Sequence, residues 1–510
     1  METARRTLAA AVLACALVLA GATIPAIASA SQEEGTAAPA ARAIPVAPVE
    51  PESTAGRIVL SIADWLEERV GSGSDGVRLT LDAPMWAEER SGTVTVHLPG
   101  ARLVEQSAPL VQWVLGDLAM AVTPRSETTY DFEIALPAEV DKRGERLTIG
   151  AGTVSGTWRS DLEIATRLQA DAENLRLVEG EGAEAAETLS LRSFAVLDEL
   201  TEGADGLWDG RSTLSLAGLV GEGFALGRLD AAGNYEDFGR DLILQMHGDF
   251  VPFAGAMSGP TALGDVLTPL ISGRWGRSDM TIALQDLRVS GAETGLGAGG
   301  DFTLGRLEVR IGADGRSEFT DISTRLSAAG FRLAEGAATE IPPALMPHAA
   351  TLDVALTRLP LRRIAEALSA SSAPEGGGAP EGGSLADIVL AHLDAADSAI
   401  EIRAIRIATP ASELRADGRL QVEPASVFGV IGRVDARVRG LSTLMALAAE
   451  EGEEDLVALL IVLQGLGQPV FEEGADEPFH AYEIDLRRDG AVTVNGIPFD
   501  MLLPGASSLQ

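Results

Sequence analysis

The chain has 510 residues, with 39 Lys and Arg against 75 Asp and Glu, a formal net charge of −36 and a single cysteine. The charge argues against a nucleic-acid binder, because a phosphate backbone requires a basic surface, and one cysteine excludes a disulfide scaffold. The hydrophobic content of 46% is too high for a disordered chain.

The N-terminus has the pattern of an export signal. Arg5 and Arg6 precede an apolar stretch over residues 8–22, and a small-x-small cleavage site ends at Ala30. The alternative is a membrane anchor, but the stretch is shorter than the roughly 20 residues that a spanning helix needs. We therefore predict a signal peptide over residues 1–30, cleaved near Ala30, and a periplasmic mature protein without a transmembrane segment. The only cysteine belongs to the removed segment.

After the signal, residues 31–56 are rich in Ala, Pro and Glu without periodicity, which predicts a flexible leader. Residues 57–70 resemble a short strand that runs into a helix. From residue 77 onward, apolar and polar residues alternate, which is typical of antiparallel strands with one buried face and one solvated face. The alternating runs cover residues 77–82, 93–97, 131–136, 162–177, 280–289, 302–311, 322–333, 352–356, 400–407 and 427–438.

Turn signals separate many of these runs. Asp-Gly occurs at 75–76, 205–206, 209–210, 314–315, 417–418 and 489–490, and Asn-Gly occurs at 495–496. On the order of fifteen strands in one sheet must curl, close or split into two layers. We predict a mainly β (α+β) fold with a large, strongly twisted antiparallel sheet, either curved into a groove or split into two layers, and a few helices at its face or ends. The expected helices cover residues 260–272, 360–370, 385–395, 441–450 and 453–465.

The clearest linker is the Gly-, Pro- and Ser-rich segment 371–384. It divides a β-rich body over residues 57–370 from a C-terminal β/helical part over residues 385–510. Because similar strands continue after it, the segment is alternatively a loop inside one continuous sheet.

A search for chemistry nominates no catalytic, cofactor-binding or metal-binding residue, and we expect no cofactor. The five histidines, His97, His247, His348, His392 and His480, are scattered without metal-ligand spacing. The glycines at 295–300 fit the letters of a dinucleotide fingerprint, but an alternating run follows where that fingerprint needs a helix. No G-x-S-x-G motif is present, and no pair among the abundant carboxylates stands out.

Two further features have simple structural interpretations. Trp65, Trp113 and Trp158 lie in apolar patterns and are predicted core residues. Residues 440–477 contain nine acidic residues and no basic one, which predicts a solvated helix face. The alternative is a docking surface for a basic partner or for cations.

Three C-terminal segments carry a family resemblance: GRLQVEP from Gly418, GRVDARVRGLSTL from Gly432, and YEIDLRRDGAVTVNGIP from Tyr482. With two helices between the second and the third, they resemble the exported family called domain of unknown function 2125. The chain is more loosely similar to β-rich AsmA-like envelope proteins, and that resemblance implies a long curved sheet with an apolar trough and a role in envelope lipid handling. The first family has no established activity and so supplies no catalytic residues.

From the one-sided strands we expect a non-enzymatic exported protein that binds or shields an apolar ligand such as lipid in a sheet-lined groove. The expected partners are lipid or another envelope protein, and no nucleic acid. One alternative is a structural or protein-interaction module with a closed core, and another is a hydrolase with an unrecognised carboxylate site. The deciding observation is whether the apolar side of the sheet is open or packed.

Overall fold

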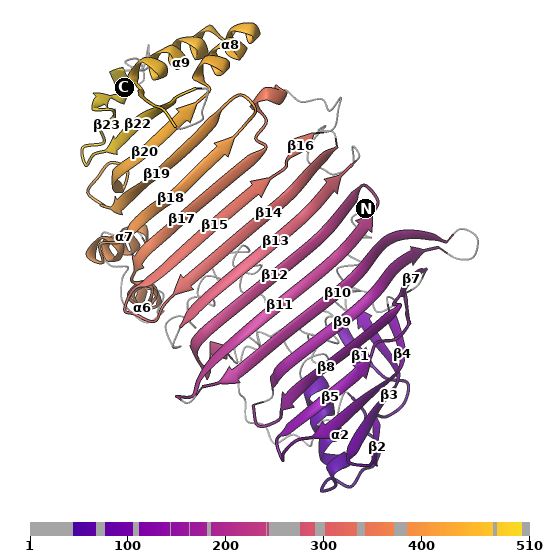
Figure 1. Cartoon of the computed structure of the whole chain (residues 1–510). Helices are drawn as coiled ribbons and strands as arrows, with labels where there is room; N and C mark the ends of the chain where they lie inside the picture. The colour runs from indigo at the N-terminus through magenta and orange to yellow at the C-terminus, as the bar shows by residue number, and fades with distance from the viewer. Residues whose placement is uncertain are drawn as a thin grey trace. The chain divides into compact units, whose positions relative to one another are not determined.

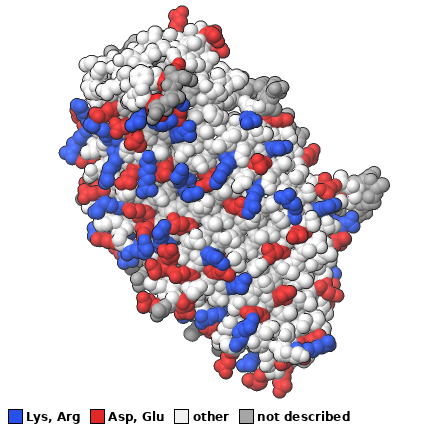
Figure 2. All heavy atoms as spheres, viewed as in Figure 1, with Lys and Arg blue, Asp and Glu red and all other residues white. Residues whose placement is uncertain are grey.

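The computed structural model describes residues 44–501, except for 68–76, 106–111, 143, 163, 181–184, 204, 241, 244–275, 291–300, 334–341, 372–384 and 473–476. The chain divides into two compact units, Met1–Leu263 (unit 1) and Gly264–Gln510 (unit 2). Both units are built from antiparallel strands with few helices, which confirms the predicted fold class (Figure 1). Charged side chains of both signs alternate across the strands (Figure 2).

Unit 1 is a continuous antiparallel sheet that begins in short, branching pairings. β3 pairs with both β1 and β2 along one edge and with β4 along the other. β4 then continues into β5 and β6, and the two branches meet again when β7 and β8 both pair with β9. Regular pairing follows from β9 to β12. The strands are β1 (Val77–Thr80), β2 (Trp86–Arg90), β3 (Thr93–Glu105), β4 (Gln112–Pro124), β5 (Thr129–Ala135), β6 (Glu139–Lys142), β7 (Glu145–Thr148), β8 (Ala151–Arg159), β9 (Ile164–Glu179), β10 (Ala186–Glu202), β11 (Leu207–Gly221) and β12 (Phe224–Gly239).

The first helix, α2 (Thr54–Leu66), begins earlier than the sequence pattern predicted. The Ser53 side chain caps it by accepting the Gly56 amide at 3.0 Å. The predicted short strand at residue 57 is therefore wrong, because the cap starts the helix upstream of it. The end of the predicted flexible leader is also placed, since Ile44 is 1% exposed and Val46 forms a parallel bridge with Met85.

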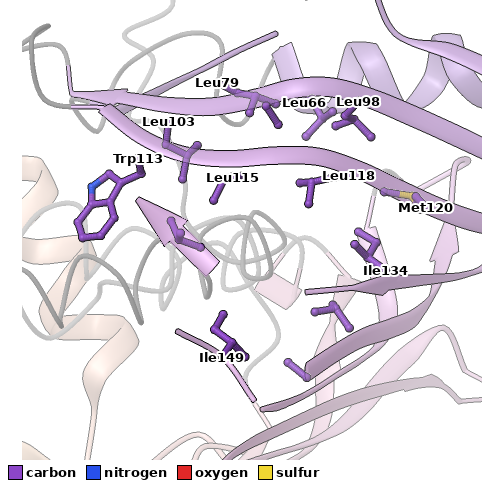
Figure 3. Packing of buried hydrophobic residues seen from close by; sticks show 14 of the residues in the cluster. Leu66, Leu79, Leu98, Leu103, Trp113, Leu115, Leu118, Met120, Ile134 and Ile149 are labelled. Atoms are coloured by element: carbon purple, nitrogen blue, oxygen red, sulfur yellow. The ribbon is translucent and has the colours of Figure 1, made fainter. Parts of the chain in front are cut away.

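The branching strands and α2 enclose the core of unit 1. Leu103, Leu147 and Leu177 are at most 1% exposed, and Val59 of α2 is fully buried among them. Figure 3 shows the side chains converging from the strands and from Leu66 at the end of α2. The strands from β1 to β9 and α2 therefore enclose a packed interior, whereas most side chains of β11 and β12 in the same unit are half-buried or exposed.

Unit 2 pairs its strands in the order β13, β14, β15, β17, β18, β19, β20, β22. Its elements are β13 (Arg277–Val289), β14 (Phe302–Asp314), β15 (Thr320–Ala329), β16 (Arg332–Leu333), η3 (Pro343–Leu345), β17 (Ala349–Leu359), α6 (Leu361–Ser371), α7 (Leu385–Ala395), β18 (Ala399–Ala408), β19 (Glu413–Val422), β20 (Val430–Arg439), α8 (Leu441–Glu451), α9 (Glu454–Leu466), β21 (Gln468–Val470), β22 (Phe479–Leu486), β23 (Val492–Val494), β24 (Ile497–Pro498) and η4 (Phe499–Met501).

The predicted linker does not separate two domains. β17 and β18 lie on either side of it in sequence and pair directly, with Leu352 opposite Ile405. The alternative interpretation, a loop within one sheet, is therefore correct for this segment. The two compact units divide instead between Leu263 and Gly264. Periodicity did not mark that boundary because strands of the same style continue on both sides of it.

The helices of unit 2 confirm four of the five predictions. α6, α7, α8 and α9 begin and end within one residue of the expected ranges, whereas the expected helix at 260–272 lies outside the described residues. In Figure 1 the four helices lie at the ends of the strands that they connect. No helix in the described part of the chain is long and apolar enough to cross a membrane.

Two of the predicted Asp-Gly turns lie inside strands. Gly210 belongs to β11 and Gly418 belongs to β19. A Cβ atom on Gly418 would meet the backbone oxygen of Arg433 at 2.4 Å, and one on Gly210 would meet the ring of Tyr235 at 2.1 Å. These glycines therefore allow close packing within the sheet rather than a change of direction.

Candidate functional site

The sheet of unit 2 has one face made almost wholly of aliphatic side chains. Residues directly opposite each other in antiparallel strands point to the same side of the sheet. Following the pairing from β13 to β20 therefore identifies one continuous surface, which we call the aliphatic face. Its members are Met280, Ile282, Leu284, Leu307, Val309, Ile311, Ala313, Ile322, Thr324, Leu326, Ala328, Ala350, Leu352, Val354, Leu356, Ile400, Ile402, Ile405, Ile407, Leu414, Ala416, Gly418, Leu420, Val434, Ala436 and Val438.

A bulge in β18 keeps its isoleucines on this face. Ile402 and Ile405 are three residues apart, so a regular strand would point them to opposite sides. The register shifts between these two residues against both β17 and β19, which places Val354 opposite Ile402 and Leu352 opposite Ile405. One extra residue in the strand thus restores the apolar pattern.

The aliphatic face is much more exposed than the interior of unit 1. Leu352 is 40% exposed, and Met280, Leu356 and Ile407 are 36–39% exposed. The other members are half-buried, apart from Ala436. By contrast, Leu177 on the inward side of β9 is fully buried. The sheet of unit 2 is therefore open on its aliphatic side, whereas the inward side of β9 in unit 1 is covered.

Helix α9 covers the face at its β20–β22 end. Leu463 and Leu466 pack against Ala436 and Tyr482. The Tyr482 hydroxyl donates to the Leu463 carbonyl at 2.9 Å, and burial raises the pKa of this tyrosine to about 12. The helices thus close one end of the aliphatic face and leave the strands from β13 to β18 half-exposed.

The opposite face of the same sheet is charged and largely paired with itself. Arg419 lies 3.3 Å from Glu401 on the neighbouring strand, and Arg433 lies 2.8 Å from both Glu483 and Asp485. Exposed pairs of this kind contribute only about 0–1 kcal/mol each, so their main effect is to keep this face hydrated while the other is apolar.

The core of unit 1 also contains an apolar cavity of about 90 Å³. Leu66, Leu103, Leu118, Phe132 and Trp158 are among the side chains that line it.

The structure brings no histidines together into a site. His97 stacks on Trp86 with ring centroids 3.9 Å apart, and the Nδ1 atom of His480 is buried without a protein hydrogen bond. His348 directly precedes β17, His392 lies in α7, and His247 lies outside the described residues. Within the described ranges, no group of three or more His, Asp or Glu side chains is arranged to hold a metal ion.

The remaining sequence features fall into the structure as follows. Trp113 is 6% exposed, as predicted for a core residue, and Trp158 lines the cavity of unit 1. The side chain of Trp65 and the glycines at 295–300 are outside the described residues, but the element after those glycines is strand β14, as expected.

The acidic stretch 440–477 is only partly a solvated face. Its Glu472 carboxylate pairs with Arg415 of β19 at 3.0 Å, and its Glu477 carboxylate accepts a hydrogen bond from Ser442. Sequence reasoning missed a cluster formed by Arg406, Arg415 and Arg439. These arginines lie on three different strands and become neighbours only through strand pairing.

These features define a class: a mainly β protein in which one antiparallel sheet has a charged face and an open aliphatic face. Residues 240–500 match the family described as "uncharacterized protein conserved in bacteria (DUF2125)". The chain belongs to this family, which confirms the resemblance noted in the C-terminal segments. The looser similarity to AsmA-like proteins stays a prediction. A search of curated proteins gave no match to this chain.

Proposed function

We propose that this protein is a non-enzymatic, exported protein of the cell envelope that holds the acyl chains of a lipid on the aliphatic face of unit 2. The observation that carries the proposal is the 36–40% exposure of large aliphatic side chains on β13, β17 and β18. Apolar surface left in water is unfavourable by about 25 cal/mol per Å². A ligand that covers these side chains would recover that free energy.

The size of the face supports an extended ligand. Strands lie about 4.8 Å apart, so the six spacings from β13 to β20 span about 29 Å. Ordinary protein surfaces carry scattered apolar residues, whereas this face is one continuous apolar patch. Large apolar patches on monomers often mark a binding site.

The composition of the face favours acyl chains over a protein partner. Protein interfaces concentrate their binding energy in Trp, Tyr and Arg, whereas the aliphatic face consists of Ile, Leu, Val, Ala and one Met, with Thr324 and Gly418 as its other members. Flexible hydrocarbon can follow such a surface without hydrogen bonds. On this proposal the lipid binds to unit 2, and the packed core of unit 1 does not bind it.

The test uses mature protein purified from the periplasm of cells that express the full chain. Organic extraction followed by mass spectrometry should recover lipid from it, and the delipidated protein should bind a fluorescent fatty acid. Leu352→Asp places a carboxylate on the aliphatic face and should weaken binding at least about tenfold, because a charge next to hydrocarbon must be desolvated. Since Leu352 is 40% exposed, the carboxylate stays hydrated in the unliganded protein and the fold should be retained.

Thr351→Asp is the matched control. It adds the same charge one residue away on the same strand, but on the charged face opposite Arg406. This variant should bind fatty acid like the wild type. Equal binding by the two variants, or wild-type protein that is lipid-free and binds no fatty acid, would refute the proposal. If lipid-free protein formed a dimer that Leu352→Asp disrupts, an interaction module would be the better interpretation.

A further inference from the structure

A second, polar site lies at the rim of the unit 2 sheet. A pocket of about 360 Å³ opens where β18 ends, β19 begins and α8 follows β20. Its polar lining includes Arg406, Arg439, Ser412, Thr443 and the rim residue Glu477. This volume is at the lower end of the roughly 300–1,000 Å³ found for small-molecule sites, and it suits a small polar group rather than a hydrocarbon chain.

A buried carboxylate organises the arginines of this pocket. Glu413 is 3% exposed and accepts hydrogen bonds from Arg406 Nε at 2.7 Å, Arg415 Nε at 2.9 Å and Arg439 Nη2 at 2.5 Å. Phe479 packs under Arg415 and Arg439, with their guanidinium carbons 4.5 and 4.8 Å from the ring centroid. The carboxylate and the ring hold the guanidinium groups in fixed positions.

The arginines of this cluster pair with nearby carboxylates and still keep further donors. Arg406, Arg415 and Arg439 contact two carboxylates, those of Glu413 and Glu472. Glu413 accepts one hydrogen bond from Arg406 and one from Arg439, whereas each guanidinium group has five N–H donors. The side chains of Arg406 and Arg439 are 50% and 35% exposed, so further donors face solvent. The exposed Glu477 carboxylate, which accepts a hydrogen bond from Ser442, also lines the pocket and balances the third arginine, so the guanidinium donors rather than a net charge define the site.

The start of α8 adds to the same pocket. The helix begins at Leu441 directly after Gly440, and no side chain caps it. Gly440 has φ +84°, and a Cβ atom there would meet the Ala411 carbonyl oxygen at 2.1 Å, so this glycine lets the helix start against the turn at 409–412. The positive end of the helix and the Thr443 side chain therefore lie beside the two arginines.

We propose that this pocket binds an oxyanion of the phosphate class, held by Arg406 and Arg439 with the hydroxyl groups of Ser412 and Thr443 as further donors. Planar guanidinium groups match phosphate oxygens in geometry as well as charge. The same chemistry is offered by the headgroup of an anionic phospholipid and by a soluble phosphate ester. The proposal does not rest on lipid binding at the aliphatic face, which lies on the other side of the sheet.

The sharpest variant is Thr443→Glu. A carboxylate at the third residue of a helix is favourable to the helix itself, so the fold should be retained while a negative charge enters the pocket. Isothermal titration calorimetry of the full mature chain would use inorganic phosphate, glycerol 3-phosphate and dihexanoyl phosphatidylglycerol as probes. Thr443→Glu should weaken binding by about tenfold or more relative to the neutral variant Thr443→Gln, because both variants remove the hydroxyl but only the first adds a negative charge.

A second pair of variants tests the arginines. Arg439→Gln should weaken binding by about 10–100-fold, the usual effect of losing a hydrogen bond from a charged group. Arg433→Gln is the control, because Arg433 lies on the same strand and face but pairs with Glu483 and Asp485 outside the pocket. If wild-type protein binds none of the three probes up to millimolar concentration, or if Thr443→Glu binds them like Thr443→Gln, the pocket is not an oxyanion site.

The probes also separate the two sources of phosphate. Tighter binding of dihexanoyl phosphatidylglycerol than of glycerol 3-phosphate would assign the pocket to a lipid headgroup. Equal affinities would assign it to a soluble phosphate ester. Either outcome can occur whether or not fatty acid binds to the aliphatic face, so the two proposals fail independently.

Discussion

Truncating one leucine in each unit tests whether the two sheets differ as the exposures indicate. Leu177 of β9 is fully buried and lies opposite Leu147 and Leu189, both themselves buried. Leu177→Ala should therefore leave a cavity and destabilise unit 1 by about 2–5 kcal/mol. Leu352 of β17 is already 40% exposed. Of the roughly 1.5–3 kcal/mol that full burial of a leucine contributes, only about 1–2 kcal/mol is at stake, and solvent can fill the space.

Urea unfolding of the mature protein measures both effects. With a slope of about 3 kcal/mol per molar urea, Leu177→Ala should lower the midpoint of unit 1 by about 1 M, and Leu352→Ala should lower that of unit 2 by about 0.5 M or less. Because five of the six tryptophans precede residue 264, their fluorescence follows mainly unit 1. Hydrogen exchange of peptides from β17 and β18 follows unit 2. If Leu352→Ala costs as much as Leu177→Ala, the aliphatic face is covered and the lipid proposal loses its basis.

Two other predictions concern contacts that complete unit 2. Tyr482→Phe removes the hydroxyl that donates to the Leu463 carbonyl, so it should destabilise the docking of α9 by about 0.5–1.5 kcal/mol. Hydrogen exchange should become faster over residues 454–466 with little change elsewhere. Unchanged exchange over these residues would contradict this role. For Glu413, burial opposes ionisation, but hydrogen bonds from Arg415 and Arg406 outweigh it and hold the pKa of the carboxyl below its ordinary value. A lowered native pKa gives stability that is present above the ordinary pKa and lost as the pH falls through the lowered one. Glu413→Gln should therefore flatten the acid-side loss of stability in urea titrations, and a variant with the wild-type pH dependence would show that this carboxylate does not contribute.

Much of the architecture followed from local patterns. Alternation identified many of the strands of both units, because one apolar and one polar face impose a period of two along a strand, but the predicted runs did not include β4, β10, β11 or β12. Helical spacing of the apolar residues located α6, α7, α8 and α9 to within one residue at each end. The start of α2 was missed because a serine cap, rather than an apolar residue, determines it.

The candidate sites were harder to predict from the sequence than the architecture. The aliphatic residues were visible as alternating positions, but alternation does not show whether a face is covered. The arginine pocket was invisible, because Arg406 and Arg439 are far apart along the chain and meet around Glu413 only when β18, β19 and β20 pair. The spacing of Ile402 and Ile405 similarly breaks the period, and only the bulge in β18 reconciles it with one face.

The sequence by itself determined a β-rich chain with one-sided strands, four of its helices and its family, because these depend on short-range periodicity and short motifs. It also showed how a net charge of −36 and 46% hydrophobic residues coexist, with acids and aliphatic residues on opposite sides of the strands. Only the tertiary structure decided that unit 1 closes around a packed core while unit 2 leaves its aliphatic face half-exposed. The reason is physical: burial depends on which elements pack over a face, and that is set by contacts between residues distant in sequence.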